Sequence, residues 1–179
     1  DHSFRTNSDT EVLLELYREY GTEMLQKLNG QFVFAIIDYV NRRLFTARDR
    51  IGIRPFYYTF VGDNILFASS IKALTKNPEV EREFNPAAFQ ELVNFWTTYG
   101  ETTFIKNIYS LSPGESLIYD QMLKKKSIYW DLQFPDHPTE LSKEAWQDRI
   151  YSELNKATAI RLRSDVPVNS YLSGGIDSS

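Results

Sequence analysis

One predicted strand, at residues 31–38, constrains the fold most, because it is apolar on both of its faces. Alternate residues of a strand point to opposite sides of its sheet. The two sets are Phe32, Phe34 and Ile36 on one side and Val33, Ala35 and Ile37 on the other. A strand of this kind needs cover on both faces. We therefore expect its sheet to be buried on both sides.

Helix signals flank this strand. Ser8 and Glu11 fit a capping box at the start of a helix that Gly21 would end, and a short second helix would carry Met24, Leu25 and Leu28. Further strands are expected at 43–49, 55–60, 65–69, 116–119 and 128–132, with a turn at 61–64 that makes a hairpin. The mixture predicts an α+β fold.

A helix over 85–99 is predicted to bury a stripe formed by Phe89, Leu92, Val93 and Trp96. The run of three lysines at 124–126 is most simply a solvated hairpin turn and not a phosphate site.

Composition excludes several kinds of protein. The net charge of −4 argues against a nucleic-acid scaffold, and no apolar run is long enough to span a bilayer. The chain has no cysteine, which excludes a disulfide framework, a thiolate zinc site and a cysteine nucleophile within these residues. The two histidines, His2 and His137, are badly placed for a catalytic triad or a metal site. The start without methionine and the stop inside a loop indicate a fragment.

The last 47 residues have a different pattern. Residues 133–140 contain two prolines and predict a linker, and 141–161 predict a long helix. An apolar strand at 166–172 would then lead into the loop Ser-Gly-Gly-Ile-Asp-Ser-Ser at 173–179. Helix, strand and glycine-rich loop are how a nucleotide-binding α/β domain begins.

The chemistry of the terminal loop favours an anion. Gly174 and Gly175 let backbone amides converge on a phosphate, and Ser173, Ser178 and Ser179 can add hydroxyl donors. Asp177 would repel a phosphate, so its natural role is to hold a bridging Mg²⁺. The loop is not a Walker A motif, because Gly-x-x-x-x-Gly-Lys is missing. A flexible Gly/Ser tail is the alternative.

Several motifs, in order along the chain, resemble the glutamine-hydrolysing asparagine synthetases. They are Phe-Arg-Thr-Asn-Ser-Asp-Thr-Glu at 4–11, Leu-Asn-Gly-Gln-Phe at 28–32, Ala-Arg-Asp-Arg-Ile-Gly-Ile-Arg-Pro at 47–55, Phe-Ala-Ser at 67–69, Ser-Pro-Gly-Glu at 112–115, Tyr-Trp-Asp at 129–131, and 161–168 with the terminal loop. The resemblance covers nearly the whole chain.

The resemblance implies two domains. Residues 1–137 would be the C-terminal part of a class II glutamine amidotransferase domain, which has the αββα sandwich of N-terminal-nucleophile enzymes, here incomplete. Residues 138–179 would begin an α/β pyrophosphate-loop domain that binds nucleotide. The full-length enzyme would be cytoplasmic and could form a homodimer. It would have no membrane or nucleic-acid partner.

The implied reaction consumes glutamine, aspartate and ATP with Mg²⁺. An N-terminal cysteine hydrolyses glutamine, and the ammonia passes internally to a β-aspartyl-AMP, giving asparagine, glutamate, AMP and pyrophosphate. In such an amidotransferase, Asp9 matches the residue that holds the α-amino group of glutamine; it could also simply favour the start of its helix. The nucleophile and the oxyanion hole lie upstream in this family, so we expect the chain alone not to hydrolyse glutamine.

For the second domain, the resemblance assigns pyrophosphate binding to Ser173, Gly174, Gly175, Asp177 and Ser178, with Asp177 as the Mg²⁺ ligand. Tyr171 falls where the family contacts adenine or ribose, usually with an apolar residue. The rest of the nucleotide site would lie beyond Ser179, so weak or no ATP binding is expected of the chain alone.

Two features leave alternatives open. Arg48, Asp49 and Arg54 are expected to brace a tight turn with ion pairs, which is a structural role. Ser70 stands where the family commonly has glutamate. The alternatives are therefore a related ligase that acts on another carboxylate, such as a sugar acid, a peptide or a β-lactam precursor, and a degenerate module without activity.

Overall fold

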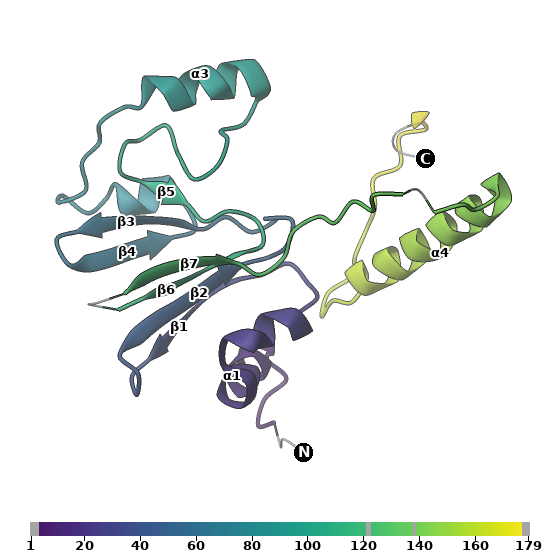
Figure 1. The fold of residues 1–179 in the computed structure, drawn as a ribbon, viewed down its shortest axis with the longest axis horizontal. Helices are drawn as coiled ribbons and strands as arrows, with labels where there is room; N and C mark the ends of the chain where they lie inside the picture. Colours follow the sequence, from purple (N-terminus) through teal and green to yellow (C-terminus); the bar gives the residue numbers. More distant parts are fainter. Residues whose placement is uncertain (1–3, 121–122, 138, 177–179) are drawn as a thin grey trace. The chain divides into compact units, whose positions relative to one another are not determined.

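The computed structural model describes residues 4–120, 123–137 and 139–176. It divides into two compact units, residues 1–132 and 133–179, which are described separately below. Figure 1 shows the order of the helices and strands along the chain.

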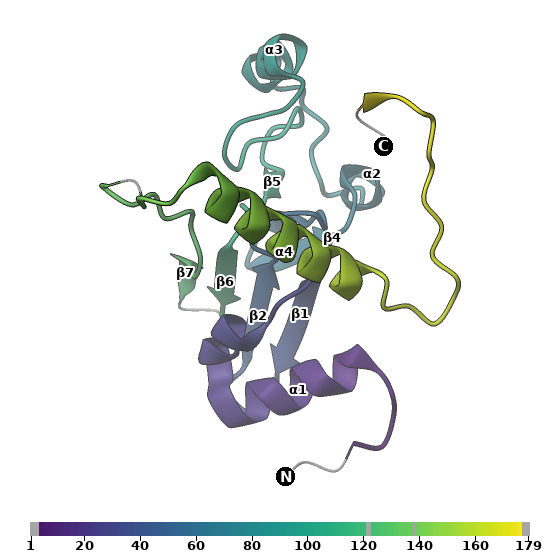
Figure 2. The ribbon, with the colours of Figure 1, turned by 90° about the vertical axis from the view of Figure 1, so that its right-hand side faces the viewer.

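The first unit contains a four-stranded antiparallel sheet, called sheet A. Its strands are β1 (Val33–Asp38), β2 (Arg43–Arg48), β6 (Glu115–Tyr119) and β7 (Lys124–Ile128), in the spatial order β1-β2-β6-β7. Figure 2 shows these strands side by side. The register pairs Ile36 with Phe45 and Phe45 with Ile118, so apolar side chains line up across one face.

A second, three-stranded sheet, called sheet B, lies against sheet A. It consists of β3 (Tyr57–Val61), β4 (Asn64–Ala68) and β5 (Tyr109–Ser110) in the order β4-β3-β5. Val61 pairs with Asn64, which leaves a two-residue turn at Gly62 and Asp63 and confirms the predicted hairpin.

Helices cover the outer face of sheet A. They are α1 (Asp9–Tyr20) and the 3₁₀ helix η1 (Gly21–Lys27), which places Met24 and Leu25 in the core. The ring of Tyr17 stacks on that of Phe45, with 5.4 Å between the centroids. Gly21 ends α1, as predicted.

Two further cores complete the layering. Between the sheets, Tyr58 of β3 and Leu117 of β6 are buried together with Phe56 and Leu111. On the outer face of sheet B, α2 (Ile71–Leu74) contributes Leu74 to a cluster with Val80 and Ile108. The order helix, sheet, sheet, helix confirms the predicted αββα sandwich (Figure 1).

Strand β1 is covered on both faces only in part. Ile36 packs in the core under α1, and Val33 packs against the core between the sheets. Ile37, however, is 58% exposed. Within the described residues, β1 has a partner strand on one side only, because β2 is its sole neighbour in the sheet order. The prediction of full cover was therefore right near the start of the strand and wrong near its end.

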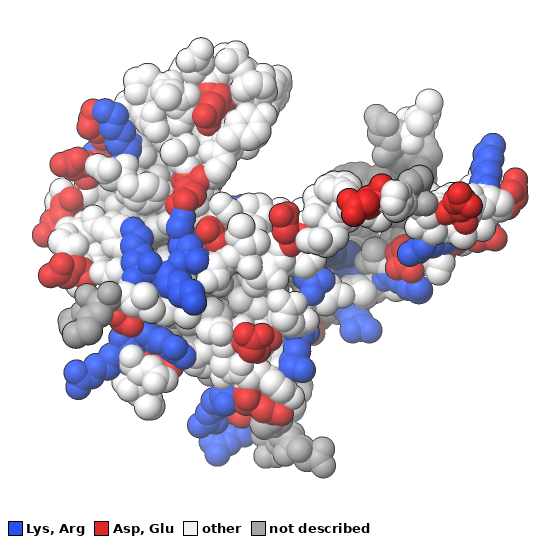
Figure 3. All heavy atoms as spheres, in the orientation of Figure 1, with Lys and Arg blue, Asp and Glu red and all other residues white. Residues whose placement is uncertain are grey.

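The predicted buried stripe on the helix after residue 85 was wrong. Helix α3 spans Pro86–Phe95 and ends at Trp96, which has a left-handed backbone, so the helix is also shorter than predicted. Only Ala88 is buried, whereas Phe89, Leu92 and Val93 are exposed and Trp96 is 91% exposed. The residues at helical spacing are apolar, but no packed layer among the described residues of the first unit covers them. Figure 3 shows α3 as an almost uncharged part of the surface.

The three lysines do not form a turn. They belong to β7, and a hydrogen bond from the Asp120 amide to the Leu123 carbonyl, at 2.9 Å, comes before them in the chain. Lys126 forms ion pairs with Glu101 and Glu115, and Lys124 Nζ lies 3.5 Å from the centroid of the Phe60 ring. Figure 3 shows basic side chains gathered over this strand. The strand predicted at 128–132 is therefore also wrong, because β7 ends at Ile128.

The second unit is one helix and an extended segment. Helix α4 spans Lys143–Arg161, close to its prediction, and Ser142 caps its start by accepting from the Ala145 amide at 3.1 Å. The strand predicted at 166–172 is absent, because no strand of the described residues pairs with this segment. Among the described residues, no helix is long and apolar enough to cross a membrane.

Candidate functional site

The start of α1 is held by hydrogen bonds that differ from the predicted capping box. The Ser8 hydroxyl accepts a hydrogen bond from the Thr10 amide at 3.2 Å. The Glu11 side chain bonds to residues that precede Ser8. Its carboxylate accepts from the amides of Arg5 and Thr6 at 2.9 and 2.8 Å. The Thr6 hydroxyl and the Arg5 amide lower the pKa of the Glu11 carboxyl below its ordinary value. Glu11 therefore fixes the segment that leads into the helix.

Asp9 is the first residue of α1 and is exposed. The Thr10 hydroxyl donates to Asp9 Oδ1 at 3.5 Å, a long contact that leaves most of the acceptor capacity of the carboxylate for other donors. The side chain borders a cavity of about 250 Å³. The other lining residues come from α1 and the segment before β1: Val12, Leu13, Leu28, Asn29, Gly30, Gln31 and Phe32.

This cavity has the chemistry of a small polar ligand site. Drug-sized ligands occupy pockets of about 300–1,000 Å³, so a smaller cavity suits a metabolite of amino-acid size. Asp9 can accept hydrogen bonds from an ammonium group. The side-chain amides of Asn29 and Gln31 offer donors and acceptors, and Leu13 and Phe32 give an apolar wall. The motif at 28–32 was part of the sequence resemblance, but the sequence did not show that it faces Asp9.

The segment at 28–32 is held by the chain that follows β2. The Asp49 amide donates to the Phe32 carbonyl at 2.9 Å, and Arg50 Nη2 donates to the Leu28 carbonyl at 3.3 Å. Both bonds start from the Arg-Asp-Arg sequence at the end of β2 and reach a segment far from it in the chain. This sequence thus positions one wall of the cavity beside Asp9.

Arg48 and Asp49 brace a tight turn, as predicted, but not through ion pairs. Arg48 donates to the backbone carbonyls of Arg54, Gly52 and Leu111 at 2.6–2.7 Å. Within the described residues, neither Arg48 nor Asp49 forms an ion pair, and Arg54 forms none either.

The Asp49 carboxylate serves the same turn from the inside. It is buried and accepts from the amides of Ile51, Ile53 and Arg54 at 2.9–3.2 Å. Burial by itself would raise the pKa of this carboxyl, but the backbone hydrogen bonds outweigh burial and lower it. The prediction that this cluster braces a tight turn is therefore confirmed. The predicted ion pairs were wrong, because the partners of Arg48 and Asp49 in the turn are backbone groups.

The terminal loop lies in the second unit. Tyr171 is fully exposed, and Gly174 has a φ of +71°, a conformation that favours glycine. A Cβ at Gly174 would meet nothing within 4 Å. Ser173 and Gly175 are exposed, whereas Asp177 and Ser178 lie outside the described residues. Serine and glycine donors with a left-handed glycine suit a pyrophosphate group.

The described residues contain no cluster of three or more His, Cys, Asp or Glu side chains able to hold a metal ion. Asp177, the expected Mg²⁺ ligand, is not among them. The donor that a magnesium ion would need thus lies outside the part of the chain that the structure describes.

Comparison with known families gives two matches. The glutamine amidotransferase domain matches residues 1–130, and asparagine synthase matches residues 149–179. The first match spans the sheets, the Asp9 cavity and the turn at Arg48. The second spans most of α4 and the terminal loop.

Similar curated proteins align over almost the whole chain. A putative glutamine-hydrolysing asparagine synthetase 2 of Methanocaldococcus jannaschii is 35% identical, over 97% of the chain and 34% of its own length. The glutamine-hydrolysing asparagine synthetase 1 of Bacillus subtilis is 38% identical, over 99% and 28%. Amidase chry2 of Gibberella zeae is 35% identical, over 100% and 26%.

The chain thus spans about a third or less of the length of these relatives. The amidotransferase match covers well over half of the chain, and the observed αββα layering agrees with it. The chain belongs to the glutamine amidotransferase domain family.

Proposed function

We propose that the full-length protein is a glutamine-hydrolysing asparagine synthetase. It would use glutamine as the nitrogen donor, aspartate as the acceptor, and ATP with Mg²⁺ to activate the acceptor. Residues 1–137 would belong to its amidotransferase domain, and residues 138–179 would begin its ATP-dependent domain. The observation that carries the proposal is the cavity that joins Asp9 to the segment 28–32.

In this proposal Asp9 binds the α-ammonium group of glutamine. An exposed carboxylate at the start of a helix is free to turn toward a ligand, and the cavity beside it has the polar and apolar walls that an amino acid needs. The helix start also favours the negative charge of Asp9. The structural role and the binding role are therefore compatible.

The two sheets support a nucleophile supplied from elsewhere in the full-length protein. The chain has no cysteine. Strands β1 and β4 are edge strands of the described sheets. Residues 33–35 of β1, and residues 67–68 of β4 with Ser69 after them, line the same apolar cavity of about 250 Å³. Open strand edges beside an apolar hollow are suited to pairing with additional strands. We propose that strands carrying the cysteine nucleophile pair there.

The ATP-dependent step would use the terminal loop. Backbone amides of Gly174 and Gly175 and the hydroxyls of Ser173 and Ser178 would hold the pyrophosphate part of ATP, and Asp177 would hold the Mg²⁺ that neutralises it. Tyr171 would lie against the adenosine. A free carboxylate is a poor acceptor for an amine, so forming an acyl-adenylate supplies the leaving group that ammonia displaces. A cytoplasmic location and a homodimer complete the proposal.

A second candidate function is amide formation on another carboxylate. The fungal relative named an amidase, which aligns over the whole chain, favours it. Ser70 does not help to choose, because it has a structural role. Its hydroxyl accepts from the Ala73 amide at 3.3 Å and caps α2, which serine does better than glutamate.

The test replaces Asp9→Asn in the full-length protein, which keeps the size of the side chain and removes its charge. We expect the KM for glutamine to rise about 10- to 100-fold, the usual loss for a hydrogen bond between charged groups. Amide formation from ammonium chloride should not change, because ammonia bypasses the glutamine site. The measurement is the rate of pyrophosphate release with each nitrogen source.

Asp63→Asn is the matched control, since Asp63 is an exposed carboxylate in the β3–β4 turn and lines no part of the Asp9 cavity. It should leave both rates unchanged. Equal losses with glutamine and with ammonium chloride would show that Asp9 supports the fold and not glutamine binding. An unchanged KM for glutamine would remove Asp9 from the site altogether.

A further inference from the structure

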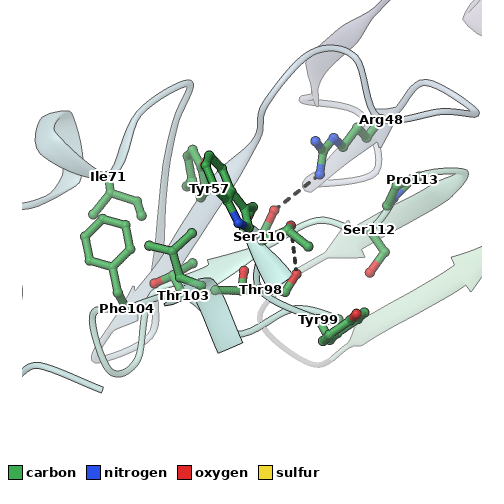
Figure 4. Close-up of a pocket in the computed structure, with 14 residues that line it drawn as sticks. Arg48, Tyr57, Ile71, Thr98, Tyr99, Thr103, Phe104, Ser110, Ser112 and Pro113 are labelled. Carbon is green, nitrogen blue, oxygen red and sulfur yellow. Dashed lines mark hydrogen bonds between the residues drawn. The ribbon is translucent and has the colours of Figure 1, made fainter. Parts of the chain in front are cut away.

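The first unit contains a second, larger cavity that is separate from the one at Asp9. Its volume is about 610 Å³, and it shares no lining residue with the Asp9 cavity. It lies between sheet B and the segment that follows α3. The residues that matter here are Arg48, Tyr57, Trp96, Thr98, Ser110 and Ser112. Figure 4 shows Arg48 and Ser110 on neighbouring walls, joined by a hydrogen bond.

The charge in this cavity has one sign. Arg48 is the sole charged residue among those that line it, with no aspartate, glutamate, lysine or histidine. The hydrogen bonds of its guanidinium go to neutral groups: three backbone carbonyls and the Ser110 hydroxyl. Burial lowers the pKa of Arg48, but an arginine remains charged near neutral pH. The neighbouring Asp49 carboxylate acts on Arg48 electrostatically and raises its pKa, but within the described residues it forms no ion pair with Arg48 and does not line the cavity. A half-buried cation on a cavity wall that carries no carboxylate attracts an anion.

Serine hydroxyls in the cavity can donate hydrogen bonds to an anion that Arg48 attracts. Ser110 Oγ accepts from Arg48 Nη1 at 3.3 Å, which polarises the hydroxyl. In the described part of the chain, no hydrogen bond uses the hydroxyl hydrogen of Ser110 or the side chain of Ser112. Ser110 and Ser112 line the same cavity as the cation, and two hydroxyl donors can bind the two oxygens of a carboxylate.

The remaining walls are aromatic and aliphatic. Tyr57, Trp96, Tyr99 and Phe104 line the cavity together with Ile71 and Leu92. Trp96 is 91% exposed at the end of α3, so a ligand could cover its indole ring. Aromatic side chains favour flat apolar groups by burying area and by stacking. By its volume the cavity suits a ligand of drug size, and its polar and apolar parts together describe a flat aromatic molecule with one negative charge.

We propose that this cavity binds an aromatic carboxylate, with the carboxylate at Ser110 and Ser112 on the side of Arg48 and the ring against Tyr57 and Trp96; phenylacetate represents its core. Binding here is independent of glutamine binding at Asp9, because the two cavities have no residue in common. The single cation favours a monoanion over a phosphate ester, whose second charge would have no partner.

The test measures binding of phenylacetate to the full-length protein by ligand-observed NMR and by calorimetry. Phenylacetamide, which has the same shape without the charge, is the matched probe. A ligand of about ten heavy atoms should bind with a dissociation constant near 1 mM. We expect phenylacetate to bind at least about tenfold more tightly than phenylacetamide, because hydrogen bonds to a charged group are the stronger ones.

Three variants locate the site. Ser110→Ala should weaken phenylacetate binding about tenfold while leaving phenylacetamide unchanged. Trp96→Ala should weaken both probes, because it removes the ring contact. Asp9→Asn should affect neither probe, and this keeps the test separate from that of the proposed function. Thermal melts of the variants check that each one folds.

Arg48 is not substituted, since it holds three backbone carbonyls of the turn. Equal binding of the two probes would overturn the role of the charge. The absence of saturable phenylacetate binding up to about 10 mM would overturn the site. Binding that survives both Ser110→Ala and Trp96→Ala would place the ligand elsewhere and would also contradict the proposal.

Discussion

The two units of the chain differ in how their residues are stabilised. Among the described residues, all the buried apolar side chains belong to the first unit, and most of them form three clusters around two sheets. In the second unit, none of the described residues is buried, although α4 has 19 residues. Yet the second unit carries the most distinctive motif of the sequence, the loop at 173–179. A motif indicates what a segment can bind, whereas packing decides whether the segment holds its shape.

The difference appears most clearly at apolar residues of the same type. Leu117 of β6 is fully buried between the sheets, and Leu154 of α4 is 61% exposed. Both occupy positions that the sequence pattern makes apolar. The comparison predicts that equal substitutions in the two units have unequal effects, and the predictions below test this in the 179-residue chain.

Leu117→Ala gives the largest expected effect. It removes a side chain that is 0% exposed, and a leucine-to-alanine change in a core costs about 2–5 kcal/mol of the free energy of unfolding. Leu154→Ala should cost no more than about 0.5 kcal/mol, because an exposed position leaves no cavity. Native-state hydrogen exchange of peptides from each unit measures both values. Similar losses of unfolding free energy in the two variants would contradict the expected difference between the two units.

Two glycines with positive φ sharpen the comparison. At Gly114 a Cβ would lie 2.3 Å from the Trp130 carbonyl oxygen, which is part of the backbone and cannot easily move. Gly114→Ala should therefore cost about 2–3 kcal/mol, from backbone strain and overpacking together.

At Gly174 the space is open, so Gly174→Ala should leave the thermal unfolding of the first unit unchanged. Differential scanning fluorimetry of the two variants makes the comparison. A Gly114→Ala variant as stable as the unmodified chain would show that the turn at 112–115 can relax.

A smaller effect concerns acid stability. Hydrogen bonds from the Asn41 side chain and backbone lower the pKa of Asp38 to about 2, and Tyr17 Oη also donates to this carboxylate at 2.8 Å. A lowered carboxyl pKa stabilises the fold above the ordinary pKa near 3.8, and this contribution disappears as the pH falls from there toward 2.

Asp38→Asn should cost about 1 kcal/mol at pH 7, a value reduced for solvent screening, and progressively less as the pH falls through about 2. Urea unfolding at a series of pH values measures the difference. Asn41→Ala should reproduce part of the loss at pH 7. A difference in the free energy of unfolding between Asp38→Asn and the unmodified chain that stays constant at every pH would contradict the role of the charge.

Local signals in the sequence predicted the elements that local forces make. The C-terminal end of α1, the extent of α4, the hairpin of β3 and β4 and the covered start of β1 follow from caps, turns and periodicity. The errors came where the conformation of a segment depends on contacts with residues far away in the sequence. The lysines at 124–126 form a strand because the segment pairs with β6, where Lys126 forms ion pairs with Glu101 and Glu115 and Lys124 lies over the Phe60 ring. In the described part of the chain no strand pairs with the apolar segment 166–172, and a strand needs such a neighbour.

The candidate site divides in the same way. Asp9 could be singled out from its motif, but not the cavity that it shares with the segment 28–32, because that contact depends on bonds from Asp49 and Arg50 to the segment. The larger cavity at Arg48 left no signal in the sequence. Its residues come from positions between 48 and 113, which only the packing of sheet B brings together.

The most direct test of the account follows the nitrogen atom. The full-length protein is given glutamine labelled with ¹⁵N in its side-chain amide, together with aspartate, ATP and Mg²⁺, and the products are followed by NMR. The account predicts label in the side-chain amide of asparagine, with one AMP and one pyrophosphate formed for each labelled amide. Label that appears only as ammonium, or cleavage of ATP to ADP and phosphate, would contradict it.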